Sequence, residues 1–105
     1  MAKTRALLVG CGGISRTWLR PVLEMPEVEI AALVDIRPEA ARQLAQEFGL
    51  QGVPTGTDLE HMLEQTAPDV VFNCTVPEAH AAVTLAALRH GCHVLGEKPL
   101  ADSLE

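Results

Sequence analysis

Hydrophobic residues in this chain fall into short runs, separated by longer stretches in which apolar and polar positions recur with the spacing of helices. The apolar runs predict strands over residues 5–9, 28–34, 70–73 and 93–95, with residues 52–54 forming at most a short edge strand. The stretches between them predict helices over residues 14–24, 38–48 and 78–90, and a further helix capped by Thr57 or Asp58. Strands and helices therefore alternate along the whole chain.

This alternation is typical of successive strand–helix–strand units, which form parallel sheets covered by helices on both faces. The element order predicts an α/β fold: a doubly wound parallel sheet (Rossmann-like) in three α/β/α layers, with strand order 3-2-1-4-5. A chain of 105 residues can bury one core, so we expect a single domain over residues 1–105. Such sheets bind ligands outside the carboxyl ends of the strands, where the order reverses between the first and fourth strands.

The first apolar run ends in a glycine-rich segment, Gly-Cys-Gly-Gly-Ile-Ser, at residues 10–15. Gly10 permits a tight turn after the strand, and Gly12 lets the backbone approach a pyrophosphate closely. The N–H groups that open the following helix add donors for the same group. Ser15 stands where a third glycine or alanine is usual. The residues expected to bind the pyrophosphate of a dinucleotide are Gly10, Cys11, Gly12, Gly13 and Ile14.

Asp35 follows the second apolar run, twenty residues after Ser15. A carboxylate at the end of the second strand suits the free ribose hydroxyls of NAD and repels the 2′-phosphate of NADP. Arg37, two residues further on, can instead bind that phosphate or stack on adenine. We expect Asp35, Ile36 and Arg37 to contact the cofactor, with NAD preferred and NADP as the alternative. Asp35 can also cap the helix that begins at Pro38.

The formal net charge of −6 and the pI near 5.1 argue against nucleic acid or an anionic membrane as a partner. No apolar run approaches the roughly 18 residues of a membrane span. Residues 3–5 precede a strand-length run that lacks a small-residue cleavage pattern. Together these features predict a cytoplasmic protein.

The chain has three cysteines, Cys11, Cys74 and Cys92, an odd number without a secretory signal, so reduced thiols are expected. The start of a helix can lower the pKa of a thiol such as that of Cys11, but a small packing residue in a tight turn is the favoured interpretation. The histidines at 80, 90 and 93 and Cys92 lack a paired ligand spacing such as Cys-x-x-Cys. We therefore predict no metal site.

Two later segments carry a family resemblance. Thr-Val-Pro-Glu-Ala-His at residues 75–80 and Gly-Cys-His-Val-Leu-Gly-Glu-Lys-Pro-Leu-Ala at residues 91–101 resemble the amino-terminal domain of the glucose-fructose oxidoreductase, inositol dehydrogenase and rhizopine-catabolism (Gfo/Idh/MocA) family. The resemblance covers essentially the whole chain. It implies binding of NAD(H) or NADP(H) and hydride transfer to or from a hydroxyl-bearing carbon of a sugar, cyclitol or related polyol.

The resemblance also implies roles for individual residues. Lys98 would be catalytic, lying near the nicotinamide and the reacting hydroxyl, where its ammonium stabilises oxyanion character or relays a proton. Glu97 and Lys98 would both contact the cofactor region, and Pro99 would fix the turn. His80 either lines the nicotinamide end or caps and packs in the first turn of its helix.

The loop after the fourth predicted strand lies at the same edge of the sheet as the glycine loop. We expect its residues Cys74, Thr75 and Val76 to contact the cofactor as well.

Full-length members of the family continue into a second domain that makes most of the substrate pocket and the usual homo-oligomer interface. No such domain follows Glu105 in this chain, so we expect cofactor binding with little or no turnover, and polyol or sugar binding only with the missing domain. Two other functions stay open: a non-catalytic nucleotide-binding scaffold or sensor, and a methyltransferase that binds S-adenosylmethionine. The methyltransferase is less favoured because it offers no role for Glu97, Lys98 and Pro99.

Overall fold

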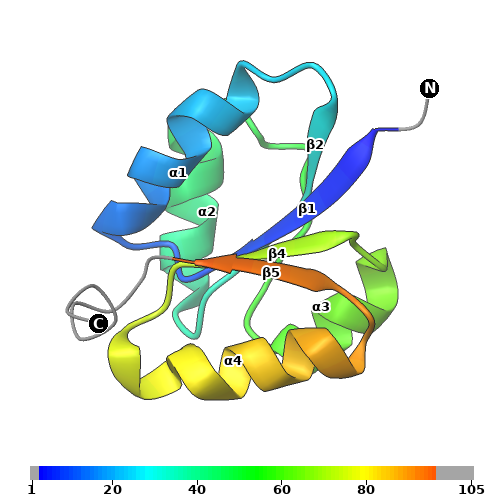
Figure 1. Ribbon diagram of the computed structural model, residues 1–105. Helices are drawn as coiled ribbons and strands as arrows, with labels where there is room; N and C mark the ends of the chain where they lie inside the picture. The colour runs from blue at the N-terminus through cyan, green and yellow to red at the C-terminus, as the bar shows by residue number, and fades with distance from the viewer. Residues whose placement is uncertain (1–2, 97–105) are drawn as a thin grey trace, which may run out of the picture.

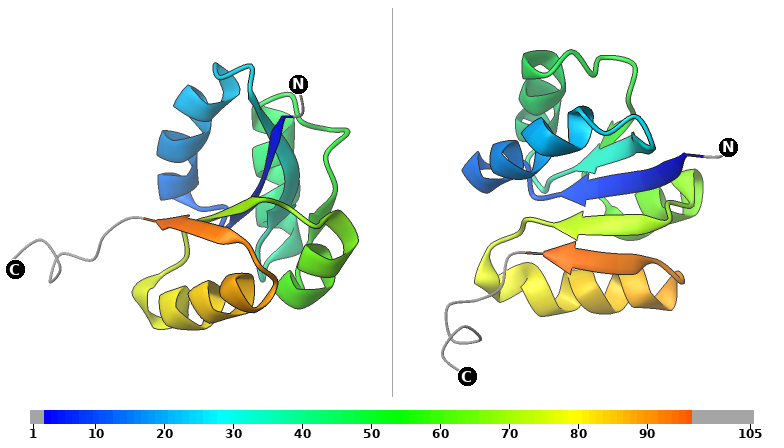
Figure 2. Two further views of the ribbon diagram at one scale, coloured as in Figure 1. Left: turned by 45° about the vertical axis from the view of Figure 1, so that its right-hand side comes forward. Right: turned by 45° about the horizontal axis from the view of Figure 1, so that its top comes forward.

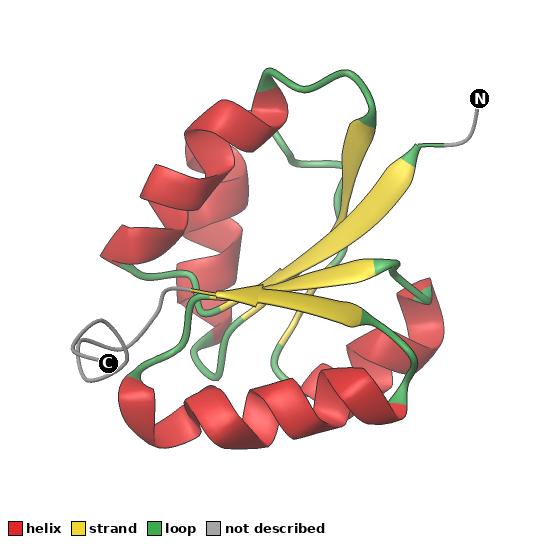
Figure 3. Cartoon of the chain, viewed as in Figure 1, coloured by secondary structure: helices red, strands yellow, loops and turns green. Residues whose placement is uncertain are grey.

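The computed structural model describes residues 3–96, in which five strands and four helices alternate (Figure 1 and Figure 3). The strands are β1 (Thr4–Val9), β2 (Val28–Val34), β3 (Thr55–Gly56), β4 (Val70–Asn73) and β5 (His93–Gly96). The helices are α1 (Gly13–Leu23), α2 (Pro38–Glu47), α3 (Leu59–Thr66) and α4 (Pro77–Arg89).

The five strands form one sheet in the order β3-β2-β1-β4-β5, and every adjacent pair is parallel (Figure 2). The predicted fold class and strand order are therefore confirmed. The order reverses between β1 and β4, where Val9 pairs with Asn73 at the carboxyl ends of both strands. The chain leaves β1 and β4 there in opposite directions, which opens the crevice at which doubly wound sheets bind ligands.

Helices cover both faces of the sheet, α1 and α2 on one and α3 and α4 on the other (Figure 1). Successive residues of β1 point to opposite faces, as the two-residue period of a strand requires. Leu8 packs in the core with α1 and α2, and Leu7 packs in the core with α3 and α4; both are fully buried. The two cores explain why the central strands are apolar at nearly every position.

The edge strand differs from the prediction. Residues 52–54 do not form it, and β3 lies at Thr55–Gly56 instead. The N–H of Val53 closes a turn onto the carbonyl of Leu50, and Pro54 has no N–H to donate to a neighbouring strand. Pairing with β2 therefore starts at the carbonyl of Pro54, which accepts from Leu33 N at 3.0 Å.

The cap of α3 is settled in favour of one of its two candidates. Asp58 is the N-cap, and its Oδ1 accepts from the backbone N–H of His61 at 3.2 Å. Satisfying an N–H that has no intrahelical partner fixes the start of the helix at Leu59.

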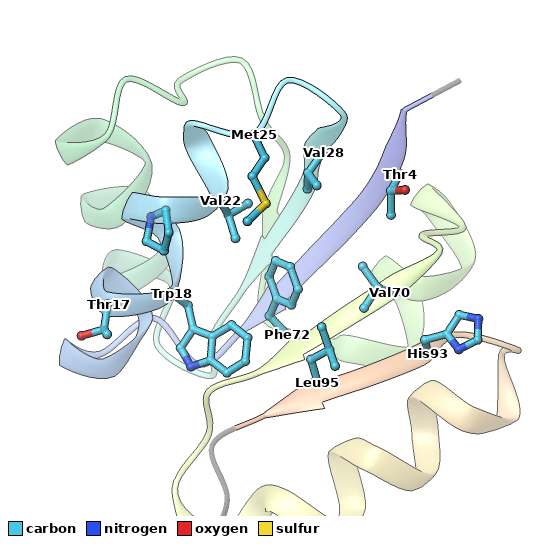
Figure 4. A pocket seen from close by; sticks show the side chains of 11 residues that line it. Thr4, Thr17, Trp18, Val22, Met25, Val28, Val70, Phe72, His93 and Leu95 are labelled. Atoms are coloured by element: carbon cyan, nitrogen blue, oxygen red, sulfur yellow. The ribbon is translucent and has the colours of Figure 1, made fainter. Parts of the chain in front are cut away.

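An apolar groove of about 670 Å³ lies over β4 and β5 on the face that α1 partly covers. Figure 4 shows Trp18, Phe72 and Leu95 around it, and the ring centroids of Trp18 and Phe72 are 5.4 Å apart. Other side chains of its wall, including Val22, Met25 and Val70, are also hydrocarbon or thioether. Such a lining offers few groups that could hold a phosphate.

Candidate functional site

A second, smaller cavity of about 280 Å³ lies at the carboxyl ends of β1, β2 and β4. It brings together residues that follow four different strands, β1, β2, β3 and β4, in the place that the strand order predicts. The predicted residues that line it are Gly10, Gly12, Asp35, Ile36, Arg37, Cys74, Thr75 and Val76.

Gly10 forms the closest contact between two of these loops. Its φ of +92° lies in the region that side chains rarely adopt. A Cβ at this position would lie 2.6 Å from the carbonyl carbon and oxygen of Cys74 and 2.8 Å from Thr75 N. Its own N–H donates to Val34 O at 2.8 Å. Only glycine can therefore join β1 to α1 while the loop after β4 lies against it.

Gly12 and Gly13 are in a different situation. Gly12 is the N-cap of α1, with φ −84°, and Gly13 is the first residue of the helix. A Cβ on either residue would meet no heavy atom of the described residues within 4 Å. Packing against residues 3–96 does not require glycine at these two positions, so within this part of the chain the space above them is room that a ligand can fill.

Asp35 holds two backbone segments together. Its side chain is 11% exposed, Oδ2 accepts from Cys11 N at 2.7 Å, and Oδ1 accepts from Arg37 N at 2.8 Å. The structure assigns the N-cap of α2 to Arg37, so Asp35 is not the cap of that helix. The Arg37 side chain is 66% exposed, and its Nε lies 4.0 Å from Oδ1 of Asp35. The Asp35 carboxylate is thus held in a fixed position in the wall of the crevice. The long, exposed side chain of Arg37 lies beside it.

Cys11 and Ser15 belong to the glycine-rich segment, and both side chains are buried. The Sγ of Cys11 donates to Val34 O at 3.4 Å. Burial, and then the nearby negative charge of Asp35, raise the pKa of the Cys11 thiol from 9.0 to about 12. The hydroxyl of Ser15 donates to Gly12 O, so a serine replaces the usual third glycine or alanine by bonding back onto the loop. Cys11 is a packing residue here and not an activated thiol.

Three of the predicted residues expose large apolar side chains near the loops of the crevice. Ile14 is 47% exposed, Ile36 is 87% exposed and Val76 is 62% exposed. Exposed apolar side chains that follow the carboxyl ends of three neighbouring strands provide surface for a flat, apolar group such as a base.

His80 lies at the far end of the site, against the end of β5. A Cβ added to Gly96 would come within 2.8 Å of His80 Nε2, and that buried nitrogen has no hydrogen-bond partner among residues 3–96. The prediction for Glu97, Lys98 and Pro99 falls on residues that lie outside the described part of the chain.

Sequence reasoning missed five residues that line the crevice: Val9, Val34, Thr57, Leu59 and Ala79. Thr57 and Leu59 follow β3, whose carboxyl end lies at the same edge of the sheet. The misplacement of this strand at residues 52–54 hid the signal. A polar loop after any parallel strand of the predicted sheet is a candidate for the site.

No three histidine, cysteine or acidic side chains within residues 3–96 lie close enough to hold a metal ion together. His90 instead contacts Glu60, with Nε2 2.8 Å from Oε1. No helix in this range is long and apolar enough to cross a membrane.

The fold and the loops at its switch point define a dinucleotide-binding domain of the Rossmann class. Comparison with known proteins agrees. Residues 4–105 match the Gfo/Idh/MocA family, described as an oxidoreductase family with an NAD-binding Rossmann fold, and the chain belongs to this family.

Individual relatives show how much of a longer protein this chain represents. It is 33% identical over 99 residues to 4-carboxy-2-hydroxymuconate-6-semialdehyde dehydrogenase of Sphingobium sp.. The matched stretch covers 94% of this chain and 31% of that protein. It is 34% identical over 98 residues to 1,5-anhydro-D-fructose reductase of Ensifer adhaerens, covering 93% of this chain and 29% of that protein. The chain thus spans about 30% of the length of these relatives.

Among solved structures, the chain is similar to myo-inositol dehydrogenase from Lactobacillus casei in complex with NAD(H) and myo-inositol. The TM-score is 0.84 at 28% identity, with 95% of this chain and 29% of that chain covered.

Proposed function

We propose that this chain binds NAD(H) in the crevice between β1 and β4, as the cofactor domain of an oxidoreductase that acts on a sugar, cyclitol or similar polyol. The observation that carries the proposal is the meeting of Gly10, Asp35 and Thr75 around one crevice at the switch point of the sheet. Membership of an NAD-binding oxidoreductase family supports it, as do relatives named for an anhydro sugar and an inositol.

The residues present fit a dinucleotide. Among residues 3–96 nothing fills the space beside Gly12 and Gly13 at the first turn of α1, where backbone N–H groups and the positive end of the helix dipole favour a pyrophosphate. Asp35 would accept from the ribose hydroxyls of the adenosine half. Ile36 and Val76 would supply apolar contacts to the base. When bound, the nicotinamide ring supplies the hydride acceptor or donor of the reaction.

Asp35 favours NAD over NADP. Its carboxylate is largely buried and is fixed by two backbone N–H groups, so it cannot easily turn away from a 2′-phosphate. Arg37 is exposed enough to reach toward such a phosphate, which leaves NADP as the weaker ligand.

Lys98 is proposed as the catalytic residue, with Glu97 beside it. Both follow β5, whose last described residue, Gly96, pairs with Asn73 at the edge of the crevice. An ammonium near the reacting hydroxyl would stabilise oxyanion character or relay its proton. His80, packed against Gly96, would line the same end of the site.

The substrate pocket and a homo-oligomeric assembly are assigned to a second domain of a longer protein, and this chain alone is expected to bind cofactor with little or no turnover. We place the protein in the cytoplasm. Its net charge of −6 gives no general attraction to nucleic acid or to an anionic membrane.

Calorimetric titration of the chain with NADH, NADPH and S-adenosylmethionine tests this function. We expect NADH to bind most tightly and Asp35→Ala to weaken it by about tenfold or more, as loss of charge-assisted hydrogen bonds implies. Asp69→Ala is the matched control, because it removes a carboxylate that accepts from a backbone N–H, Arg5 N at 2.8 Å, just before β4 and away from the crevice, and leaves Asp35 in place. Preference for S-adenosylmethionine, or equal NADH affinity in both variants, would contradict the proposal.

A further inference from the structure

A fully buried amide joins the loop after β4 to two turns of α4. Asn73 is the last residue of β4, is 0% exposed, and lies between Val9 of β1 and Gly96 of β5. Burying an amide in a parallel sheet costs free energy unless its polar atoms are hydrogen-bonded. The three residues before it in β4 are apolar, so Asn73 is a polar exception placed at the crevice end of the strand.

The amide of Asn73 is fully used. Its Nδ2 donates to His80 O at 2.9 Å and to Thr84 Oγ1 at 3.1 Å. Its Oδ1 accepts from Thr75 Oγ1 at 2.6 Å and from Thr75 N at 3.3 Å. A carbonyl can only accept and a backbone N–H can only donate, so these partners fix which end of the amide faces which side.

This orientation decides the state of the Thr75 hydroxyl. Its proton is committed to Asn73 Oδ1, which leaves lone pairs on Thr75 Oγ1 as acceptors. Thr75 lines the crevice, and its backbone is held against Gly10, where an added Cβ would lie 2.8 Å from Thr75 N. The Oγ1 acceptor therefore belongs to a residue that lines the crevice and whose backbone position is fixed.

Building on the NAD(H) site proposed above, we infer that Asn73 is a positioning residue that holds Thr75 as the acceptor for a ribose hydroxyl of the dinucleotide. A phosphate oxygen has no proton to give and would be repelled, whereas a sugar hydroxyl donates. Asp35 takes the ribose at the end of β2, and β4 lies across the switch point, where the second mononucleotide half binds. The ribose that Thr75 recognises is that of the nicotinamide half.

A matched pair of variants tests this inference. Thr75→Val and Thr84→Val each replace a threonine by its near-isostere, and each removes one hydroxyl partner of Asn73, but only Thr75 lines the crevice. The ligands are NADH, ADP-ribose, which keeps the second ribose, and ADP, which lacks it. We expect Thr75→Val to weaken NADH and ADP-ribose by about two- to tenfold, as one neutral hydrogen bond implies, and to leave ADP unchanged. Thr84→Val should leave the affinities for all three ligands unchanged.

Further variants separate positioning from folding. Thr75→Ser keeps the hydroxyl and should restore NADH affinity. Asn73→Ala should lower the NADH-to-ADP affinity ratio as Thr75→Val does. The double variant Asn73→Ala/Thr75→Val should lower the ratio no further, because both substitutions remove the same interaction between Thr75 and the ribose. Melting temperatures show whether each variant folds. If Asn73→Ala does not fold, Thr75→Val and Thr84→Val still test whether the Thr75 hydroxyl accepts from the ribose.

The inference is overturned if Thr75→Val leaves the NADH-to-ADP ratio unchanged, or if Thr84→Val lowers it equally. In either case NADH binding by the unaltered chain would still support the proposed function. Absence of NADH binding by the unaltered chain would instead remove the proposed function, and this inference with it.

Discussion

The backbone N–H of Cys11 donates a hydrogen bond of 2.7 Å to Oδ2 of Asp35, which ties the glycine loop after β1 to the end of β2. The other carboxylate oxygen accepts from Arg37 N at 2.8 Å. One side chain thus shapes two of the backbone segments that form the crevice. A carboxylate has about four lone-pair sites, so Asp35 keeps acceptor capacity for a ribose while it holds the loop.

Asp35 should therefore contribute to stability as well as to binding. Asp35→Ala removes both hydrogen bonds and leaves two N–H groups without that partner, so we expect the free energy of unfolding to fall by about 2 kcal/mol. Urea denaturation followed by circular dichroism measures it. An unchanged urea midpoint would show that the two bonds contribute nothing to folding.

Replacing the carboxylate should also change the choice of cofactor. Asp35→Ser removes the charge that repels a 2′-phosphate and leaves Arg37 in place, so the NADPH-to-NADH affinity ratio should rise by about tenfold or more. Calorimetry with both cofactors measures the ratio. The double variant Asp35→Ser/Arg37→Ala is the control and should lose most of the gain; if it keeps the gain, Arg37 does not bind the phosphate.

Gly10 and Gly12 should respond in opposite ways to the same substitution. Gly10→Ala places a Cβ 2.6 Å from the Cys74 backbone at a φ of +92°, and should destabilise the fold by about 3 kcal/mol or prevent folding. Gly12→Ala meets no heavy atom of residues 3–96 within 4 Å, so the variant should fold and lose far less stability than Gly10→Ala, at most the small cost of alanine at an N-cap. It should nevertheless weaken NADH binding, because its methyl group fills the space left for the pyrophosphate.

Thermal melting and NADH titration of the two glycine variants separate these effects. Tight NADH binding by a folded Gly12→Ala protein would contradict a pyrophosphate at this loop.

The buried thiol of Cys11 gives stability a pH dependence of known sign. The pKa of Cys11 is about 12 in the folded chain and 9.0 ordinarily, so the folded state keeps the proton that the unfolded state releases. Its contribution to stability is complete below pH 9 and is lost as the pH rises from 9 toward 12. Cys11→Ala should therefore show a shallower loss of stability than the unaltered chain between those limits, measured by urea denaturation at several pH values. Parallel curves would rule out this role for the thiol.

Much of the fold could be predicted because its signals are local. The continuous apolar run that forms β2 and the run that forms β4 gave bounds that the structure reproduces, Val28–Val34 and Val70–Asn73. The edge strand was misplaced because β3 has only two residues and carries no apolar pattern. Its position depends on where Pro54 allows pairing with β2, which is a tertiary contact.

The site could be predicted only in part for the same reason. Gly10 and Asp35 could be identified as candidates from the sequence. A tight turn after the first strand requires glycine, and binding ribose hydroxyls after the second strand requires a carboxylate, each at a particular spacing. The hydrogen bond from Cys11 to Asp35 and the approach of Thr75 to Gly10 join segments that are distant in sequence, so no local pattern indicates them. The buried Asn73 network is likewise visible only once β4 and α4 are packed.

The most direct test of the site is an NMR titration of the 15N-labelled chain with NADH, followed through backbone amide shifts. The largest changes should fall on the amides of the glycine loop, Cys11, Gly12, Gly13 and Ile14, and on those of Arg37 and Thr75, which line the crevice. The apolar groove over β4 and β5 is the larger cavity, and it serves as an internal comparison. Changes centred on Trp18, Phe72 and Leu95, with the glycine loop unaffected, would contradict a dinucleotide site at the β1–β4 switch point.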